Sequence, residues 1–171
     1  MKISGVTEHG ERGRASLARV RAVANYQFES DVGSALFPED IRITYSKKTG
    51  RLRHFYLEEK VIATLRPTDG FLSLTLEGAK RLAEALPPPR FRVVVREDVV
   101  TFIAEGKDVF ARHVVDADPL LRVGEEAIVI SPRGKVVAVG KALLTGKEML
   151  GFKRGVAVKV RKGVNETRCE E

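Results

Sequence analysis

Residues 106–161 read GKDVFARHVVDADPLLRVGEEAIVISPRGKVVAVGKALLTGKEMLGFKRGVAVKVR, a segment in which short apolar runs alternate with turns. The apolar runs of this segment, and one run just before it, span residues 91–95, 114–115, 126–130, 136–139 and 156–160. The turn residues between them are Gly124, Pro132-Arg133-Gly134 and Gly155. Short strands at such spacing predict a compact, mostly β barrel. Residues 99–105 and 147–152 read as helices, with Gly106 ending the first in the left-handed conformation.

The last apolar run also carries positive charge. Residues 151–164 contain no carboxylate and hold Lys153, Arg154, Lys159, Arg161 and Lys162. Because side chains alternate along a strand, the valines of residues 156–160 face one side, and Lys159 and Arg161 face the other. Two interpretations stay open: a surface that faces phosphates, or a solvated edge strand protected from aggregation by its charges.

The composition favours a polyanionic partner. The 171 residues include 30 Lys and Arg against 23 Asp and Glu, a formal net charge of +7, and nucleic acid is the commonest polyanion. A single cysteine, Cys169, excludes an intramolecular disulfide and a cysteine-based zinc site. No segment has the apolar length of a signal peptide core or a membrane span, so we expect a cytoplasmic protein. The absence of Trp and the high Glu, Lys and Arg content suggest a heat-adapted source.

Pro87-Pro88-Pro89 is the clearest break in the chain, because neither a helix nor a central strand tolerates this run. We therefore expect two domains, with the boundary at the prolines. The expected organisation is a flexible amino terminus at residues 1–13, an α+β domain at 14–88, a second domain at 89–164 and a disordered tail at 165–171.

The first domain opens on a predicted helix at residues 15–28, with Ser16 as its cap. The apolar stripe of this helix is Leu17, Val20, Ala24 and Phe28. Beside that stripe fall Arg14, Arg21 and Asn25, which either offer charge to a partner or simply solvate the helix.

Strands follow this helix. Residues 41–45 and 51–57 alternate around a turn at 46–50, which predicts a hairpin. Residues 61–66 and 71–76 flank the turn signal at 67–70. A second helix is expected at residues 77–86. Its expected buried stripe is Leu76, Ala79, Leu82, Ala83 and Leu86.

The second domain resembles the PUA domain, a small RNA-binding pseudo-barrel found in pseudouridine synthases and archaeosine transglycosylases. The residues that carry the resemblance are Gly106, Phe110–Val115, Asp118, Gly124, Gly134, Ala138-Val139-Gly140, Glu148-Met149 and Gly155–Val158.

The first domain resembles the segment that precedes the PUA domain in archaeosine tRNA-guanine transglycosylase. Tyr26-Gln27-Phe28, within residues 19–28, is the strongest mark, and Gly33 and Leu36-Phe37 continue it. Further matching segments are residues 46–53, 65–70 and 76–82. Together the two resemblances cover residues 14–162 and imply an α+β chain, in which a small antiparallel sheet with two helices precedes a PUA pseudo-barrel.

The resemblance implies a protein that binds tRNA and performs no chemistry of its own. In the archaeal transglycosylase family, base exchange belongs to a TIM barrel with an aspartate nucleophile and a zinc ion bound by cysteine and histidine. This chain contains neither. It is therefore expected to be an accessory or split subunit in archaeosine-type tRNA modification, which positions tRNA by its acceptor stem and 3′ end beside a separate catalytic subunit. The alternative is a PUA protein linked to the ribosome or to translation initiation.

The residues themselves agree with a non-catalytic protein. His9, His54 and His113 are scattered along the chain without metal-ligand spacing, and no nucleophile elbow, zinc-protease motif or phosphate loop is present. The aspartates at residues 69 and 116–118 stand in turn-like contexts, where aspartate is usually structural. We expect no catalytic residue, no metal and no cofactor.

The resemblance places the RNA-binding face on the first PUA helix with the strand after it, and on the last strand with the loop before it. Those positions are Gly106, Lys107, Arg112, His113, Phe152, Lys153, Arg154, Gly155, Lys159 and Arg161. Glycine lets phosphate approach the backbone, and the cations neutralise it. Phe152 is either a stacking platform or core, His113 is either a base contact or a strand residue, and Phe110 is assigned to the core.

Secondary RNA-binding candidates lie in the first domain. They are Arg14, Arg21, Arg51 and Arg53. Whether this domain grips RNA through these arginines or docks a protein through its sheet stays open.

Overall fold

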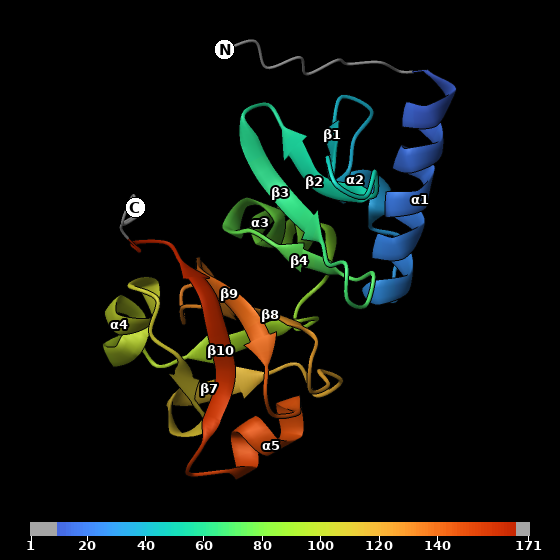
Figure 1. Ribbon diagram of the computed structural model, residues 1–171. Helices are drawn as coiled ribbons and strands as arrows, with labels where there is room; N and C mark the ends of the chain where they lie inside the picture. Colours follow the sequence, from blue (N-terminus) through green and yellow to red (C-terminus); the bar gives the residue numbers. More distant parts are fainter. Residues whose placement is uncertain (1–9, 167–171) are drawn as a thin grey trace. The chain divides into compact units, whose positions relative to one another are not determined.

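The computed structural model describes residues 10–166. Expectations for residues 1–9 and 167–171, including His9 and Cys169, lie outside these residues. The chain divides into two compact units, Met1–Ala85 and Leu86–Glu171, and each has a sheet of its own (Figure 1).

The first unit has a four-stranded antiparallel sheet in the order β1-β2-β3-β4, on which the helices pack. Its elements are α1 (Glu11–Gln27), α2 (Gly33–Leu36), β1 (Arg42–Tyr45), β2 (Leu52–Leu57), β3 (Lys60–Leu65), β4 (Leu72–Leu74) and α3 (Leu76–Ala85). The predicted β1–β2 hairpin is confirmed, and α2 is a short helix that the sequence pattern did not reveal.

Helix α1 begins earlier than its apolar pattern suggests. Leu17, Val20 and Ala24 are buried, as predicted, but the helix starts at Glu11, so the cap assignment of Ser16 is wrong. The Ser16 hydroxyl instead lies 2.9 Å from the Tyr45 hydroxyl on β1. Residues 11–13, expected in the flexible start, form the first turn of the helix because it extends one turn beyond the apolar stripe.

The Tyr26-Gln27-Phe28 motif closes the free edge of the sheet. Gln27 Nε2 donates to the Leu72 carbonyl at 2.9 Å, and Gln27 Oε1 accepts from the Leu72 backbone N–H at 2.7 Å. This amide therefore pairs with β4 as a neighbouring strand would, and satisfies backbone groups that an edge strand leaves open. Phe28 is buried beneath it, and Tyr26 points outward with 76% of its surface exposed.

The second unit is a mostly β, barrel-like sheet in the order β6-β10-β9-β8-β5-β7. Its strands are β5 (Arg92–Val95), β6 (Val109–Phe110), β7 (Val114–Ala117), β8 (Glu126–Ile130), β9 (Val136–Ala142) and β10 (Val156–Gly163). Its helices are α4 (Val100–Ala104) and α5 (Gly146–Gly151), with 3-10 turns η1 (Glu97–Val99) and η2 (Ala111–His113). The fold class expected from the sequence is confirmed.

Strand β10 is not an edge strand, so that interpretation of its charges is wrong. It pairs with β6 on one side and β9 on the other. The short β6, which the sequence pattern did not show as a strand, supplies the pairing that covers the start of β10. Within residues 10–166, every helix is too short or too polar to cross a lipid bilayer.

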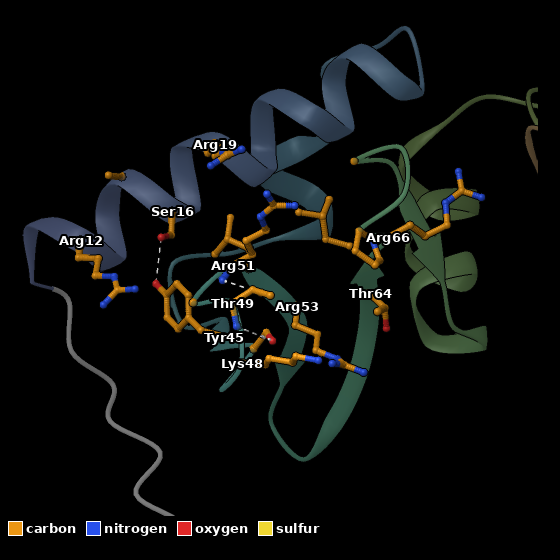
Figure 2. A pocket seen from close by; sticks show the side chains of 17 residues that line it. Arg12, Ser16, Arg19, Tyr45, Lys48, Thr49, Arg51, Arg53, Thr64 and Arg66 are labelled. Carbon is orange, nitrogen blue, oxygen red and sulfur yellow. Dashed lines mark hydrogen bonds between the residues drawn. The ribbon is translucent and has the colours of Figure 1, made fainter.

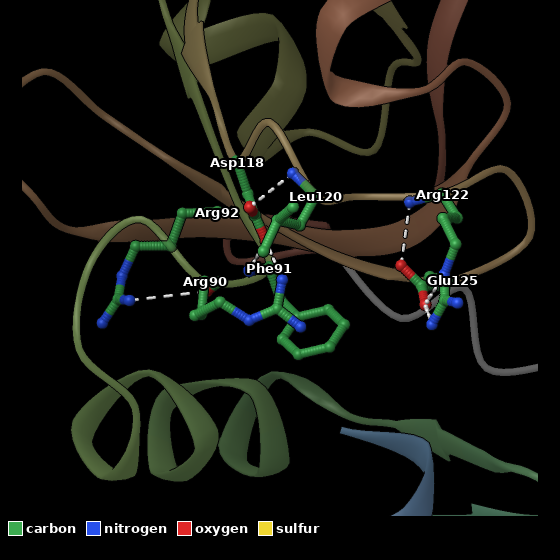
Figure 3. Close-up of polar contacts among 7 residues, drawn as sticks. All are labelled: Arg90, Phe91, Arg92, Asp118, Leu120, Arg122 and Glu125. Carbon is green, nitrogen blue, oxygen red and sulfur yellow. Dashed lines mark hydrogen bonds and ion pairs between the residues drawn. The ribbon is translucent and has the colours of Figure 1, made fainter. Parts of the chain in front are cut away.

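Asp118 joins the start of β5 to the turn after β7 (Figure 3). Its side chain is 1% exposed, and it accepts from the Phe91 N–H at 2.9 Å, the Leu120 N–H at 2.9 Å and Arg90 Nη1 at 2.7 Å. Its own N–H donates to the Arg92 carbonyl at 2.9 Å. A buried carboxylate with this many donors fixes two chain segments at once.

We expect Asp118→Ala to reduce the free energy of unfolding of the second unit by about 3 kcal/mol, because it leaves buried donors and the Arg90 guanidinium without their acceptor. Hydrogen exchange of the β5 and β8 amides measures this loss in the full chain. The control is Asp98→Ala, which removes an exposed partner of Arg96 and should cost less than about 0.5 kcal/mol. Equal losses in the two variants would contradict the role given to Asp118.

Candidate nucleic-acid interface

The fold brings the two predicted RNA-binding segments of the second unit side by side. Strand β6 pairs with β10, so that Phe110 lies opposite Val156. Just beyond this pairing, the Ala111 N–H donates to the Gly155 carbonyl at 2.9 Å. Residues 106–113 and 152–161 therefore form one continuous surface.

Four cations of this surface extend into solvent. Lys107 and Arg112 come from the first segment, and Lys153 and Arg154 come from the loop before β10; all four are exposed. Within residues 10–166, no carboxylate forms an ion pair with any of them. These charges are therefore available to a polyanion.

The two predicted RNA-binding cations of β10, Lys159 and Arg161, are held by carboxylates of the protein. Lys159 Nζ lies 2.8 Å from Asp108 Oδ2, and the other oxygen of Asp108 accepts from the Val160 N–H at 3.0 Å. The Arg161 guanidinium forms two hydrogen bonds to the Glu126 carboxylate, which is 1% exposed. The predicted alternation is confirmed, but Arg161 is first of all the partner of a buried charge.

Two aromatic rings lie on the same surface. Phe152 is 48% exposed and Phe110 is 43% exposed, so the assignment of Phe110 to the core is wrong. Phe110 belongs to the two-residue strand β6, whose alternation buries Val109 instead. The Arg112 guanidinium carbon lies 5.8 Å from the centre of the Phe110 ring, and His113 meets that ring edge-on at 6.3 Å.

His113 lies in the 3-10 turn η2, half-buried beneath this surface. Its Nε2 accepts from Arg112 Nε at 3.2 Å, whereas its Nδ1 is buried without a partner among the described residues. Burial lowers the pKa of His113, and the nearby Arg112 and Arg96 lower it further, against a smaller opposing effect of Asp98. The ring is therefore neutral at pH 7.

The two glycines of the predicted site differ in their accessibility. Both have positive φ, +95° at Gly106 and +97° at Gly155, and the left-handed end predicted at Gly106 is confirmed. A Cβ at Gly155 would meet nothing within 4 Å, so the backbone there is open to a ligand. At Gly106 the Glu166 carboxylate occupies that space, with its carbon 3.1 Å from the same position.

The candidates of the first unit separate into two pairs. Arg51 and Arg53 line a pocket of about 850 Å³ between α1, the β1–β2 hairpin and the turn after β3 (Figure 2). Arg14 and Arg21 do not line it. Arg21 ties its own unit together, because it donates to the Phe37 carbonyl at 2.8 Å and pairs with Glu39 at 2.9 Å.

Sequence reasoning missed further cations of this pocket, which are Arg12, Arg19, Lys48 and Arg66. Arg12 and Arg19 are seven residues apart and lie on one face of α1. That spacing is visible in the sequence, but Arg12 preceded the expected helix start. Among residues 10–166, no group of three or more His, Cys, Asp or Glu side chains is placed to hold a metal ion.

We expect Arg161→Gln to lower the free energy of unfolding by about 2 kcal/mol, because Glu126 then keeps a buried charge without its guanidinium partner. Lys153→Gln, an equal change of charge at an exposed site, should leave stability unchanged. Urea unfolding of both variants tests the assignment. Equal stability in the two variants would show that Arg161 is not a structural cation.

The stability of the second unit should also depend on pH through His113. Its folded pKa lies below its ordinary value of 6.5, so the unfolded chain binds the proton first. The contribution of the neutral ring is present above pH 6.5 and is lost as the pH falls through the folded pKa. The protection factors of the β7 amides, which correct for the pH dependence of intrinsic exchange, should therefore fall below pH 6.5, and less so in His113→Gln. A steeper response in this variant would contradict the account.

Both units match described families. Residues 18–89 match the patch-forming domain C2 of tRNA-guanine transglycosylase, and residues 91–164 match the PUA domain. The tRNA-guanine(15) transglycosylase of Thermococcus kodakarensis is 46% identical over 159 residues, which cover 93% of this chain and 27% of that protein. The enzyme of the same name from Methanothermobacter thermautotrophicus is 43% identical over 147 residues, which cover 86% of this chain and 22% of that protein.

Solved structures share the fold of the whole chain. A hypothetical protein from Pyrococcus horikoshii superposes with a TM-score of 0.71 at 23% identity, covering 90% of this chain and 93% of its own. A conserved PUA domain protein from Thermoplasma acidophilum has a TM-score of 0.61 at 21% identity, covering 88% and 89%. The chain spans about a quarter of the curated transglycosylases that it matches. It belongs to the PUA-domain proteins and consists of the two domains, C2 and PUA, that form the carboxyl-terminal portion of tRNA-guanine transglycosylases.

Proposed function

We propose that this protein binds tRNA through its PUA domain, at the acceptor stem and the 3′ end, and positions it for archaeosine-type modification. The observation that carries the proposal is the surface at residues 106–113 and 152–155, where exposed cations surround two exposed rings. Relatives named for a tRNA modification support tRNA as the RNA.

The cations of this surface suit a duplex stem. Phosphate contacts from Lys107, Arg112, Lys153 and Arg154 would fix the register of the RNA without reading its sequence. Gly155, whose backbone is open, allows a phosphate to approach closely. In this proposal Lys159 and Arg161 flank the contact surface on β10, and their own contacts remain with Asp108 and Glu126.

The rings suit the unpaired end of the same RNA. Stacking of a base on an exposed aromatic side chain contributes about 1–3 kcal/mol and tolerates any base. Phe152 precedes Lys153 at the start of the cationic loop and is exposed, which supports a role in stacking on the nucleotide that follows the last phosphate contact. We assign Phe152 the stacking role and His113 the support of Arg112.

The protein acts in the cytoplasm as an accessory or split subunit. Residues 14–88 and 89–164 form its two functional domains, and the transglycosylase active site that they serve lies outside residues 1–171. The proposal assigns no catalytic residue, metal or cofactor to residues 10–166. Co-purification with a catalytic transglycosylase subunit is expected, and its absence would count against the accessory role while leaving tRNA binding in place.

Binding to intact tRNA, to tRNA that lacks the 3′ CCA end, and to a plain RNA duplex at two salt concentrations tests the proposal. Intact tRNA should remain preferred at the higher salt concentration. Phe152→Ala should weaken binding to intact tRNA about tenfold and leave the truncated tRNA unaffected. Leu150→Ala, which removes a side chain that is 50% exposed on α5, is the matched control and should change neither.

Lys153→Gln/Arg154→Gln should flatten the salt dependence for all three RNAs by about two units, one for each lost phosphate contact. Equal binding to the three RNAs that disappears at higher salt would contradict recognition of the acceptor end. Association with the ribosome would then become the leading account, and co-sedimentation with ribosomes at moderate salt would test it.

A further inference from the structure

The pocket of the first unit is strongly basic. It is lined by Arg12 and Arg19 on α1, by Lys48, Arg51 and Arg53 on the hairpin, and by Arg66, and no carboxylate lines it. All of these except Arg66 are exposed. Arg66 pairs with Asp69 at 3.1 Å, whereas no ion pair within residues 10–166 involves the other five.

The fold holds these cations around one space. Figure 2 shows Arg12 and Arg19 along one side of α1, with Arg51 beneath the helix and Lys48 and Arg53 on the hairpin. The Ser16–Tyr45 hydroxyl contact joins the helix to the hairpin at 2.9 Å. The Arg12 guanidinium carbon lies 4.6 Å from the centre of the Tyr45 ring, which orients that side chain. Cations that line one pocket without a carboxylate among them repel one another, so the arrangement favours an anion in the pocket.

The same helix face continues to an exposed aromatic platform. Tyr26 lies seven residues after Arg19, and its ring is parallel to Phe71 within 2°, with ring centres 6.4 Å apart. Phe71 directly follows Gly70, which lines the pocket. Gln27 fixes this junction through its two hydrogen bonds to Leu72. A row of phosphates in the pocket would therefore lead toward a surface on which a base can stack.

We infer that this pocket is a second RNA-binding site, which takes consecutive phosphates of a strand and stacks one of its bases on Tyr26. RNA as the ligand rests on the proposed function, but the pocket shares no residue with the PUA surface. A sugar–phosphate strand suits this lining, because its six cations come from the helix, the hairpin and the turn after β3 and can meet several phosphates in succession.

Arg19→Gln/Arg51→Gln tests the site against Lys47→Gln/Lys80→Gln in the full chain. The second variant makes the same change of charge in the same unit, at exposed residues that do not line the pocket. The affinity for intact tRNA is measured from about 50 to 200 mM salt. The pocket variant should flatten the salt dependence by about two units, and the control should leave it unchanged.

Tyr26→Ala should weaken binding about tenfold without changing the salt dependence, and Tyr26→Phe should retain the wild-type affinity.

Equal salt dependences in the pocket variant and the wild-type chain would overturn the inference. If Lys153→Gln/Arg154→Gln still flattens the salt dependence of tRNA binding in that case, the proposed PUA function is retained. If only the pocket variant flattens the salt dependence, RNA binding at the pocket is supported and RNA binding at the PUA surface is contradicted. Binding of tripolyphosphate that requires Arg19 and Arg51, with tRNA binding unaffected, would assign the pocket to a small phosphate compound and overturn its role in RNA binding.

Discussion

The PUA surface depends on the buried carboxylate of Asp118, which does not itself lie on that surface. Asp118, 1% exposed, ties the start of β5 to the turn after β7 through the Phe91 and Leu120 N–H groups and the Arg90 guanidinium. Strand β5 pairs with β7 on one side, where the strands are antiparallel, and with β8 on the other, where they are parallel. A parallel neighbour needs a long crossover connection, and Asp118 lies within the crossover that leads from β5 to β8. Strands β9 and β10, and the cationic loop before β10, build on that frame.

Pairing with internal carboxylates divides the cations into two kinds. Arg161, Lys159 and Arg21 satisfy carboxylates or carbonyls of their own unit, and so hold strands and helices in register. Lys153, Arg154 and the pocket cations other than Arg66 have no such partner among residues 10–166. These cations without a carboxylate partner lie in the loop before β10, on one face of α1 and on the β1–β2 hairpin. The net charge of +7 does not distinguish the cations that pair with groups of the protein from those that do not.

The residue pattern was sufficient for the strands other than β6, the hairpin and the α+β class, because alternation and turn residues act locally. It failed where the answer depended on a distant partner. Phe110 looked like core because it stands in an apolar run, but its pairing with β10 buries Val109 instead. Arg161 looked available because Glu126, its partner, is 35 residues away in the sequence. Arg12 and Arg19 were missed because the hairpin that completes their pocket comes later in the chain.

Two basic sites on one chain lower the affinity that each site needs by itself for the chain to bind RNA. Each exposed phosphate contact is weak and screened by salt, so neither four cations nor five suffice for tight binding under physiological conditions. If both proposed sites engage one RNA, the second contact forms at a high effective concentration. The proposed stacking on Phe152 and Tyr26 would add a contribution that salt does not screen, and would thereby distinguish unpaired from paired RNA.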